Sequence, residues 1–151
     1  MKVVISADHA GFETKQQLVT ALTERGYAIT DLGTHSTEPV DYPDFAEAVA
    51  QAIRSNQAER GIIVCGSGAG VSIVANKFPG VRAAVCHDLY TAHQAVEHDD
   101  LNVLCLGARV ISSKLALEIT ENFLKARFTG EDRHRRRLDK LLAVETKFLR
   151  S

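Results

Sequence analysis

The chain has 151 residues, 45% apolar and 25% charged, which is typical of one globular domain spanning 1–151. Its net charge of −1 gives no global reason to expect nucleic acid or a membrane as a partner, and its short apolar runs exclude a transmembrane helix. The opening MKVVISADH lacks the apolar region of a signal peptide, and the three cysteines lack CxxC spacing. We therefore expect a reduced, cytoplasmic protein without a disulfide framework or a zinc ribbon.

Apolar β-branched runs alternate with helical patterns along the chain. In chain order the patterns predict a strand at 3–5, a helix at 11–25, a strand at 27–32, a loop at 33–43, a helix at 44–55, a strand at 62–65, a helix at 71–76, a strand at 81–86, a helix at 89–97, a strand at 103–106 and a helix at 115–126. Strands separated by helices indicate a parallel sheet covered on both faces. The expected fold is a Rossmann-like, three-layer α/β/α sandwich with five strands.

One more helical pattern, at about 131–150, follows the five strand–helix units. Its apolar stripe comprises Leu138, Leu141, Leu142, Phe148 and Leu149. A helix beyond a finished sheet often buries such a stripe on a second subunit, so we expect a homodimer or a dimer of dimers. The alternative is that this helix folds back on its own sheet.

A glycine-rich turn, CGSGAG from Cys65 to Gly70, follows the third expected strand and opens a helix. Glycines let main-chain N–H groups approach an anion, and ligands of open α/β sheets bind at the carboxyl edge of the strands. A dinucleotide fingerprint looks similar, and Asp88 lies 18 residues beyond Gly70, where a ribose-binding acid belongs. The GxGxG spacing and the absence of a phosphate-loop lysine argue against that interpretation, and a purely structural turn stays open.

Cys65 ends its strand immediately before the glycines, where nearby N–H groups would stabilise a thiolate. The alternative is a buried, inert thiol, which we expect for Cys86 and Cys105 because no glycine turn follows them. Asp8 and His9 end the first strand at the same edge of the sheet. The pair is therefore expected to converge on Cys65.

The densest positive charge is the run RHRRR at 133–137. Arg133 and Arg137 are four residues apart and share one helix face, which suits a phosphate dianion. A solvated basic face and an ion-pair network are alternatives, whereas the near-neutral chain and its 6% aromatic content argue against nucleic acid. His98 has the position of a solvated residue at a helix end. Surface or structural roles are expected for His35, His87 and His93.

Five segments together resemble one known family. They are SADHAGFETK (6–15), DYP (41–43), IIVCGSGAGVSIVANKFPGVRAA (62–84), NVLCLGARV (102–110) and RHRRR (133–137). The sequence resembles type B ribose-5-phosphate isomerases, a family that includes galactose-6-phosphate and allose-6-phosphate isomerases. The resemblance implies a sugar-phosphate isomerase domain acting in the pentose phosphate pathway, with active sites shared between the subunits of a dimer and with no metal or cofactor.

The resemblance also implies residue roles. Cys65 would be the base that moves a proton between C2 and C1 of the sugar, and His98 would help to open the furanose ring. The anion hole for the enediolate would be formed by Gly66, Gly68, Ala69 and Gly70, assisted by the Ser67 hydroxyl. Contacts with the sugar or its phosphate would come from Asp8, His9, Tyr42, Asp99, Arg109, Arg133, His134 and Arg137.

One position departs from the family pattern, because Asp99 stands where the family usually has Asn after His98. A carboxylate cannot donate to a sugar oxygen unless it is protonated, and its charge would oppose an enediolate. Either Asp99 turns away from the sugar, or it accepts a hydrogen bond from a hydroxyl group of a different sugar phosphate, such as a tetrose, allose or galactose phosphate. A non-catalytic sugar-phosphate-binding module is the remaining alternative.

Overall fold

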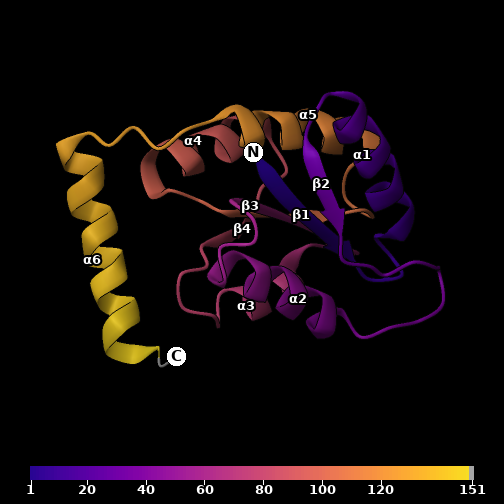
Figure 1. The fold of residues 1–151 in the computed structure, drawn as a ribbon, viewed down its shortest axis with the longest axis horizontal. Helices are drawn as coiled ribbons and strands as arrows, with labels where there is room; N and C mark the ends of the chain where they lie inside the picture. The colour runs from indigo at the N-terminus through magenta and orange to yellow at the C-terminus, as the bar shows by residue number, and fades with distance from the viewer. Residues whose placement is uncertain (150–151) are drawn as a thin grey trace.

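The expected three-layer α/β/α architecture is confirmed by the computed structural model, which describes residues 1–149 (Figure 1). The strands are β1 (Lys2–Ala7), β2 (Ala28–Asp31), β3 (Arg60–Cys65), β4 (Ala83–Val85) and β5 (Val103–Gly107). The helices are α1 (Phe12–Glu24), α2 (Tyr42–Arg54), α3 (Ala69–Ala75), α4 (Leu89–Asp99), α5 (Ser113–Lys125) and α6 (Asp132–Phe148). Arg150, the last residue of the expected C-terminal helix, and Ser151 lie outside the described residues.

All five strands are parallel, in the order β2-β1-β3-β5-β4, so β1, β3 and β5 are interior strands. One apolar core joins the sheet to α1, α4 and α5, and a second core joins its other face to α2 and α3 (Figure 1). Ile62, Ile63 and Val64 of β3 are consecutive yet fully buried, because each face of the sheet is covered. The parallel order brings the carboxyl ends of β1, β3 and β5 to one edge.

Two helices at that edge begin two residues earlier than the periodicity predicts. Tyr42 opens α2 because Asp41 has extended N-cap geometry and Pro43 fits the first turn, where a missing N–H costs nothing. The expected loop at 33–43 therefore ends at Asp41. Gly68 precedes Ala69, the first residue of α3, and has φ 82°, a left-handed conformation that glycine adopts without strain.

Strand β4 is one of the two outermost strands of the sheet and spans three residues rather than the six expected at 81–86. The Asn76 carboxamide donates to the Ala83 carbonyl at 2.8 Å and accepts the Ala83 N–H at 2.9 Å. Asn102 accepts the Arg82 N–H just before this strand, at 2.7 Å. The Asn76 side-chain amide therefore takes the hydrogen bonds that a further strand would otherwise make with Ala83.

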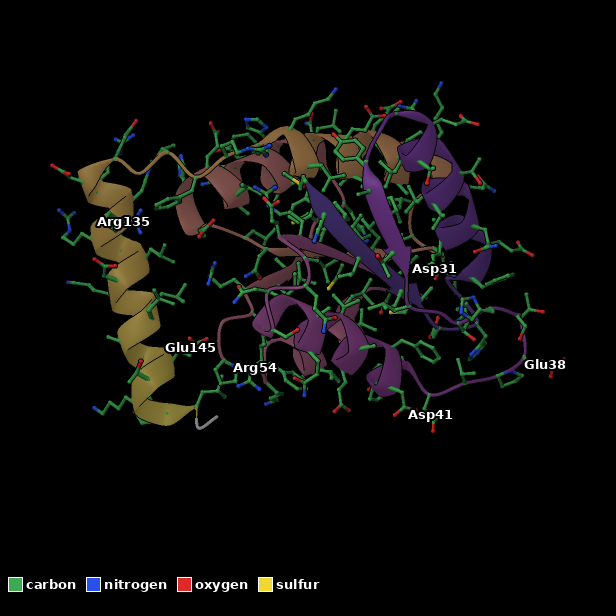
Figure 2. All side chains as sticks on the ribbon, in the orientation of Figure 1. Asp31, Glu38, Asp41, Arg54, Arg135 and Glu145 are labelled. Atoms are coloured by element: carbon green, nitrogen blue, oxygen red, sulfur yellow. The ribbon has the colours of Figure 1, made fainter. Side chains whose placement is uncertain are left out.

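Helix α6 stands beside α4 at one side of the molecule and covers neither face of the sheet (Figure 1). The alternative that this helix folds back on its own sheet is therefore wrong. Leu138 is buried, whereas Val144 and Phe148 are 60% and 72% exposed. Figure 2 shows Glu145 directed toward the body, where its carboxylate accepts the Gly80 N–H at 2.9 Å. Within residues 1–149 no helix has the length and apolar character needed to cross a membrane.

Candidate active site

A cavity of about 360 Å³ opens at the carboxyl edge of the sheet. Its lining comprises Asp8, Tyr42, Cys65, Gly66, Ser67, Gly70, Arg109 and Val110. Asp8 follows β1, Cys65 ends β3, and Arg109 follows β5, so three neighbouring strands deliver these groups to one place. The convergence of Asp8 on Cys65 expected from the sequence is confirmed, whereas His9, expected there as well, is not among the residues that line this cavity.

The Cys65 thiol faces the glycine-rich turn. Its Sγ accepts the Gly68 N–H at 3.1 Å, and the side chain is 6% exposed, so it borders the cavity without standing free in solvent. The turn can wrap the sulfur because Gly68 adopts its left-handed conformation, where a Cβ would lie 3.1 Å from the main chain of Leu106. The dipole of the Gly68 amide therefore points at the sulfur.

The turn also presents unpaired main-chain donors. Ala108 N–H donates to the Cys65 carbonyl at 2.8 Å, and Arg109 N–H donates to the Gly66 carbonyl at 3.0 Å. A trans peptide is planar with its C=O and N–H opposed, so fixing these two carbonyls directs the Gly66 and Ser67 N–H groups the other way. Among residues 1–149 these two N–H groups meet no acceptor. They form an anion cradle beside the thiol.

Three predicted sugar contacts are held by local hydrogen bonds or packing. The Asp8 carboxylate accepts the N–H groups of Ala10 and Gly11 at 3.0 and 3.1 Å, which fixes it as an acceptor at the end of β1. His9 Nδ1 accepts the Val40 N–H at 3.1 Å, so in the neutral ring the proton lies on Nε2. The Tyr42 ring packs on the α-carbon of residue 70, where a Cβ would lie 2.6 Å from the ring.

The remaining cysteines have the inert character expected of them. Burial raises the pKa of Cys86 to about 11 and also raises the pKa of the fully buried Cys105 thiol. Asp88 accepts the N–H and hydroxyl of Thr91 at 2.6 and 2.8 Å, and these bonds lower the pKa of its carboxyl group. Asp88 therefore caps α4, and this engagement argues against the ribose-binding role considered from the sequence.

A second cluster joins α4 to α6. The His98 and His134 rings stack with centroids 4.0 Å apart and planes 26° apart. The Gln94 amide is hydrogen-bonded to His98 Nδ1 at 2.9 Å, which holds the orientation of the ring. The sequence analysis missed Gln94, although its position four residues before His98 puts both on one helix face. An adjoining cavity of about 410 Å³ is lined by Leu89, Tyr90, His93, Gln94, Glu97, His98 and Asn122.

His134 is the buried member of the basic run, with 2% of its surface exposed. Its Nδ1 is hydrogen-bonded to the Thr129 hydroxyl. Burial lowers the pKa of His134, and the nearby His98 and Arg133 lower it further, so the ring favours its neutral form. A neutral His134 can orient His98, and any contact with a phosphate would come from a hydrogen bond rather than from charge.

The two arginines predicted to grip phosphate lie on the same helix. Arg133 Nη2 contacts Glu131 at 3.2 Å and its side chain is 60% exposed, and Arg137 one turn later is exposed as well. Asp99, the last residue of α4, is exposed and lines a separate groove of about 520 Å³ between α4, β4 and α6. Asp99 therefore lines this groove, whereas His98 lines the cavity beside Gln94.

The two clusters lie at opposite edges of the sheet. Helix α4 leaves the carboxyl edge after β4 and runs back to the start of β5, so His98 lies at the amino edge. The 11 residues of α4 span about 16 Å at 1.5 Å per residue. Cys65 and Arg109 thus belong to one group within a chain, and His98, Arg133 and Arg137 to another. Among residues 1–149, no group of three His, Cys, Asp or Glu side chains could hold a metal ion.

The site thus consists of a thiol beside main-chain donors and a separate group of histidines and arginines, both on a parallel α/β sheet. The model of the ribose/galactose isomerase family matches residues 3–141, and the chain belongs to that family. Ribose-5-phosphate isomerase B of Escherichia coli strain K12 is 42% identical over 144 residues, which cover 95% of this chain and 96% of that protein.

Solved structures are similar along the whole chain. Ribose-5-phosphate isomerase B of Clostridium thermocellum has 48% identity and a TM-score of 0.95, covering 98% of this chain and 99% of that one. Ribose-5-phosphate isomerase B of Mycoplasma genitalium, solved with bound ribulose-5-phosphate, has 38% identity and a TM-score of 0.90, covering 97% of each chain. The family resemblance seen in the sequence motifs is confirmed.

Proposed function

We propose that this protein interconverts ribose 5-phosphate and ribulose 5-phosphate through an enediolate, with Cys65 as the base. The observation that carries the proposal is the Cys65 thiol beside the unpaired Gly66 and Ser67 N–H groups in one cavity. Similarity to ribose-5-phosphate isomerases B, one of them solved with ribulose-5-phosphate, supports the choice of substrate. Since the base must stay reduced, we expect the protein to act in the cytoplasm.

The reaction needs one proton to cross between adjacent carbons. The Cys65 thiolate removes the proton from C2 of the open-chain aldose, the C1–C2 double bond forms, and the carbonyl electrons move to O1. The thiol then returns the proton to C1, while O2 becomes the carbonyl oxygen and its hydroxyl proton passes to O1. Gly66 and Ser67 N–H groups stabilise the charge on oxygen, and one such donor contributes about 2.7–4 kcal/mol in acyl-transfer enzymes.

The other expected residues serve ring opening and binding. His98, held in place by Gln94, is suited to protonate the ring oxygen of the furanose. Arg133 and Arg137 would bind the phosphate together with Arg109, so that binding energy orients the distant carbons.

We further propose that each active site combines the Cys65 group of one subunit with the His98 and arginine group of another. Within one chain these groups lie at opposite edges of the sheet, so a single copy cannot bring them to one sugar. A twofold dimer supplies both combinations at once, because each group of one copy meets the complementary group of the other. The exposed apolar side chains of α6, Val144 and Phe148 among them, would then be covered by the partner.

The choice of ribose over other sugar phosphates rests partly on Asp99. This carboxylate lines the groove beside α6 rather than the cavity beside His98, which supports the alternative that it turns away from the sugar. We expect Asp99→Asn to change kcat/KM for ribose 5-phosphate by less than about threefold. This is well below the tenfold change that a loss of about 1.4 kcal/mol of transition-state stabilisation would cause. A larger gain, with higher wild-type activity on allose or galactose phosphate, would shift the assignment to another substrate.

An exchange assay in heavy water tests the function directly. Wild-type protein with ribose 5-phosphate should introduce deuterium at C1 of the ribulose 5-phosphate formed, detected by NMR, whereas tetrose and hexose phosphates should exchange more slowly. Cys65→Ala should abolish exchange and still bind ribose 5-phosphate in calorimetry. Near-wild-type turnover by Cys65→Ala would remove Cys65 as the base, and binding without wild-type exchange would favour a non-catalytic module.

A further inference from the structure

His87 makes a hydrogen bond that the sequence analysis did not anticipate. Its Nε2 accepts the Gly107 N–H at 2.9 Å, at the point where β5 extends beyond its neighbour β4. One step earlier, the Cys105 carbonyl on the same side of β5 accepts the Cys86 N–H at 3.4 Å. Gly107 N–H is the next group on that side, two residues on, and β4 has already ended at Val85. The His87 side chain thus replaces a missing strand as acceptor.

The residue fixed by this bond is in direct contact with the anion cradle. A Cβ on Gly107 would lie 2.7 Å from the Ser67 carbonyl, so the two main chains touch. The next two residues, Ala108 and Arg109, donate to the carbonyls of Cys65 and Gly66. These two bonds set the direction of the unpaired cradle N–H groups, because each peptide is planar. A continuous main-chain route therefore runs from His87 to the cradle.

We propose that His87 is a positioning residue for the isomerisation: by holding Gly107 it fixes the turn after β5, and through that turn the anion cradle. This inference rests on the proposed function, which gives the cradle its task of stabilising the enediolate. His87 is not within the residues lining the Cys65 cavity, so it acts through Gly107 rather than on the sugar. Because enediolate charge develops only during reaction, loss of the bond should lower kcat more than it changes KM.

The chemistry of the bond suggests matched variants. Accepting an N–H needs a lone pair on Nε2, so the His87 ring must be neutral with its proton on Nδ1. The side-chain oxygen of Gln lies at a similar reach from Cβ and also accepts. Leu retains bulk without an acceptor, and the Asn side chain carries an acceptor but is too short to reach the Gly107 N–H. His87→Gln should preserve the function of the residue, while His87→Leu and His87→Asn should lose it.

Steady-state kinetics with ribose 5-phosphate test this directly. For His87→Leu and His87→Asn we expect kcat to fall about tenfold, with KM within about twofold of the wild-type value. The expected loss is smaller than the fall of about 10²–10³ in kcat when an oxyanion-hole donor is removed outright. His87→Gln should stay within about twofold of wild type. His35→Leu, a change at an exposed loop histidine, controls for loss of a histidine. An unchanged kcat in the Leu and Asn variants, or equal loss in all three, would overturn the proposal.

A second readout is independent of turnover. In wild-type protein labelled with nitrogen-15, the N–H···N bond should give a scalar coupling between the Gly107 amide nitrogen and His87 Nε2, and His87→Gln should remove that coupling while keeping activity. Absence of the coupling in the wild type would overturn the role of His87. Wild-type protein that shows the coupling but isomerises no sugar phosphate would instead refute the proposed function, so the two failures are distinguishable.

Discussion

The proposed sharing of active sites can be tested by building dimers with one variant chain of each kind. Cys65→Ala inactivates the thiol group, and Arg137→Ala weakens the arginine group at the other edge of the sheet. In a mixed dimer, one site combines the intact Cys65 of the second chain with the intact Arg137 of the first, and the other site carries both defects. The mixed dimer should therefore have about half the wild-type kcat per dimer, although each parent dimer is impaired.

Coexpression with two different affinity tags, followed by purification on both, isolates the mixed dimer for an isomerase assay. The matched control pairs Cys65→Ala with Asp8→Ala, because both residues line the same cavity and every site of that dimer carries a defect. This control should remain inactive. No recovery in the Cys65 and Arg137 pair would show that a single chain assembles its own site and would refute the argument from the sheet edges. Recovery in the control would show that Cys65 and Asp8 of one chain do not serve the same site.

Three further outcomes are expected. Burial lowers the pKa of His134, so protonation of this ring opposes folding. In urea titrations, the contribution of His134 to the free energy of unfolding should be constant above about pH 6.5 and fall below that pH. His134→Gln should make this fall smaller. Iodoacetamide should label Cys65 first and ribose 5-phosphate should protect it, while mass spectrometry should find Cys86, whose pKa is about 11, unlabelled in folded protein. Gly107→Ala should lower the free energy of unfolding by about 1–3 kcal/mol, as overpacking does, and reduce kcat, because its Cβ would meet the Ser67 main chain at 2.7 Å.

The sequence was most informative where local chemistry decides the structure. Runs such as Ile62-Ile63-Val64 predict a strand buried on both faces, and the glycines after Cys65 predict a turn with exposed N–H groups. Both features depend on the residues themselves and their immediate neighbours. The expected boundaries were less accurate, because the start of α2 at Tyr42 is set by Asp41 and Pro43 rather than by apolar periodicity.

Contacts between distant segments could not be derived in the same way. His87 was expected to be a surface or structural residue, since nothing near it in sequence indicates that β5 continues past β4 and leaves the Gly107 N–H to be satisfied. The stacking of His134 on His98 likewise depends on where α6 lies after a loop. The family resemblance implies roles for both His98 and His134, but periodicity carries no information on which edge of the sheet each one reaches.

The Asn76 carboxamide at the rim of β4 bears on how copies of this protein can associate. Because it holds both outward groups of Ala83, another polypeptide cannot simply continue the sheet there, and ribbon-like stacking of subunits is disfavoured. A subunit that approaches this side of the molecule therefore has to use side-chain contacts rather than a continued sheet.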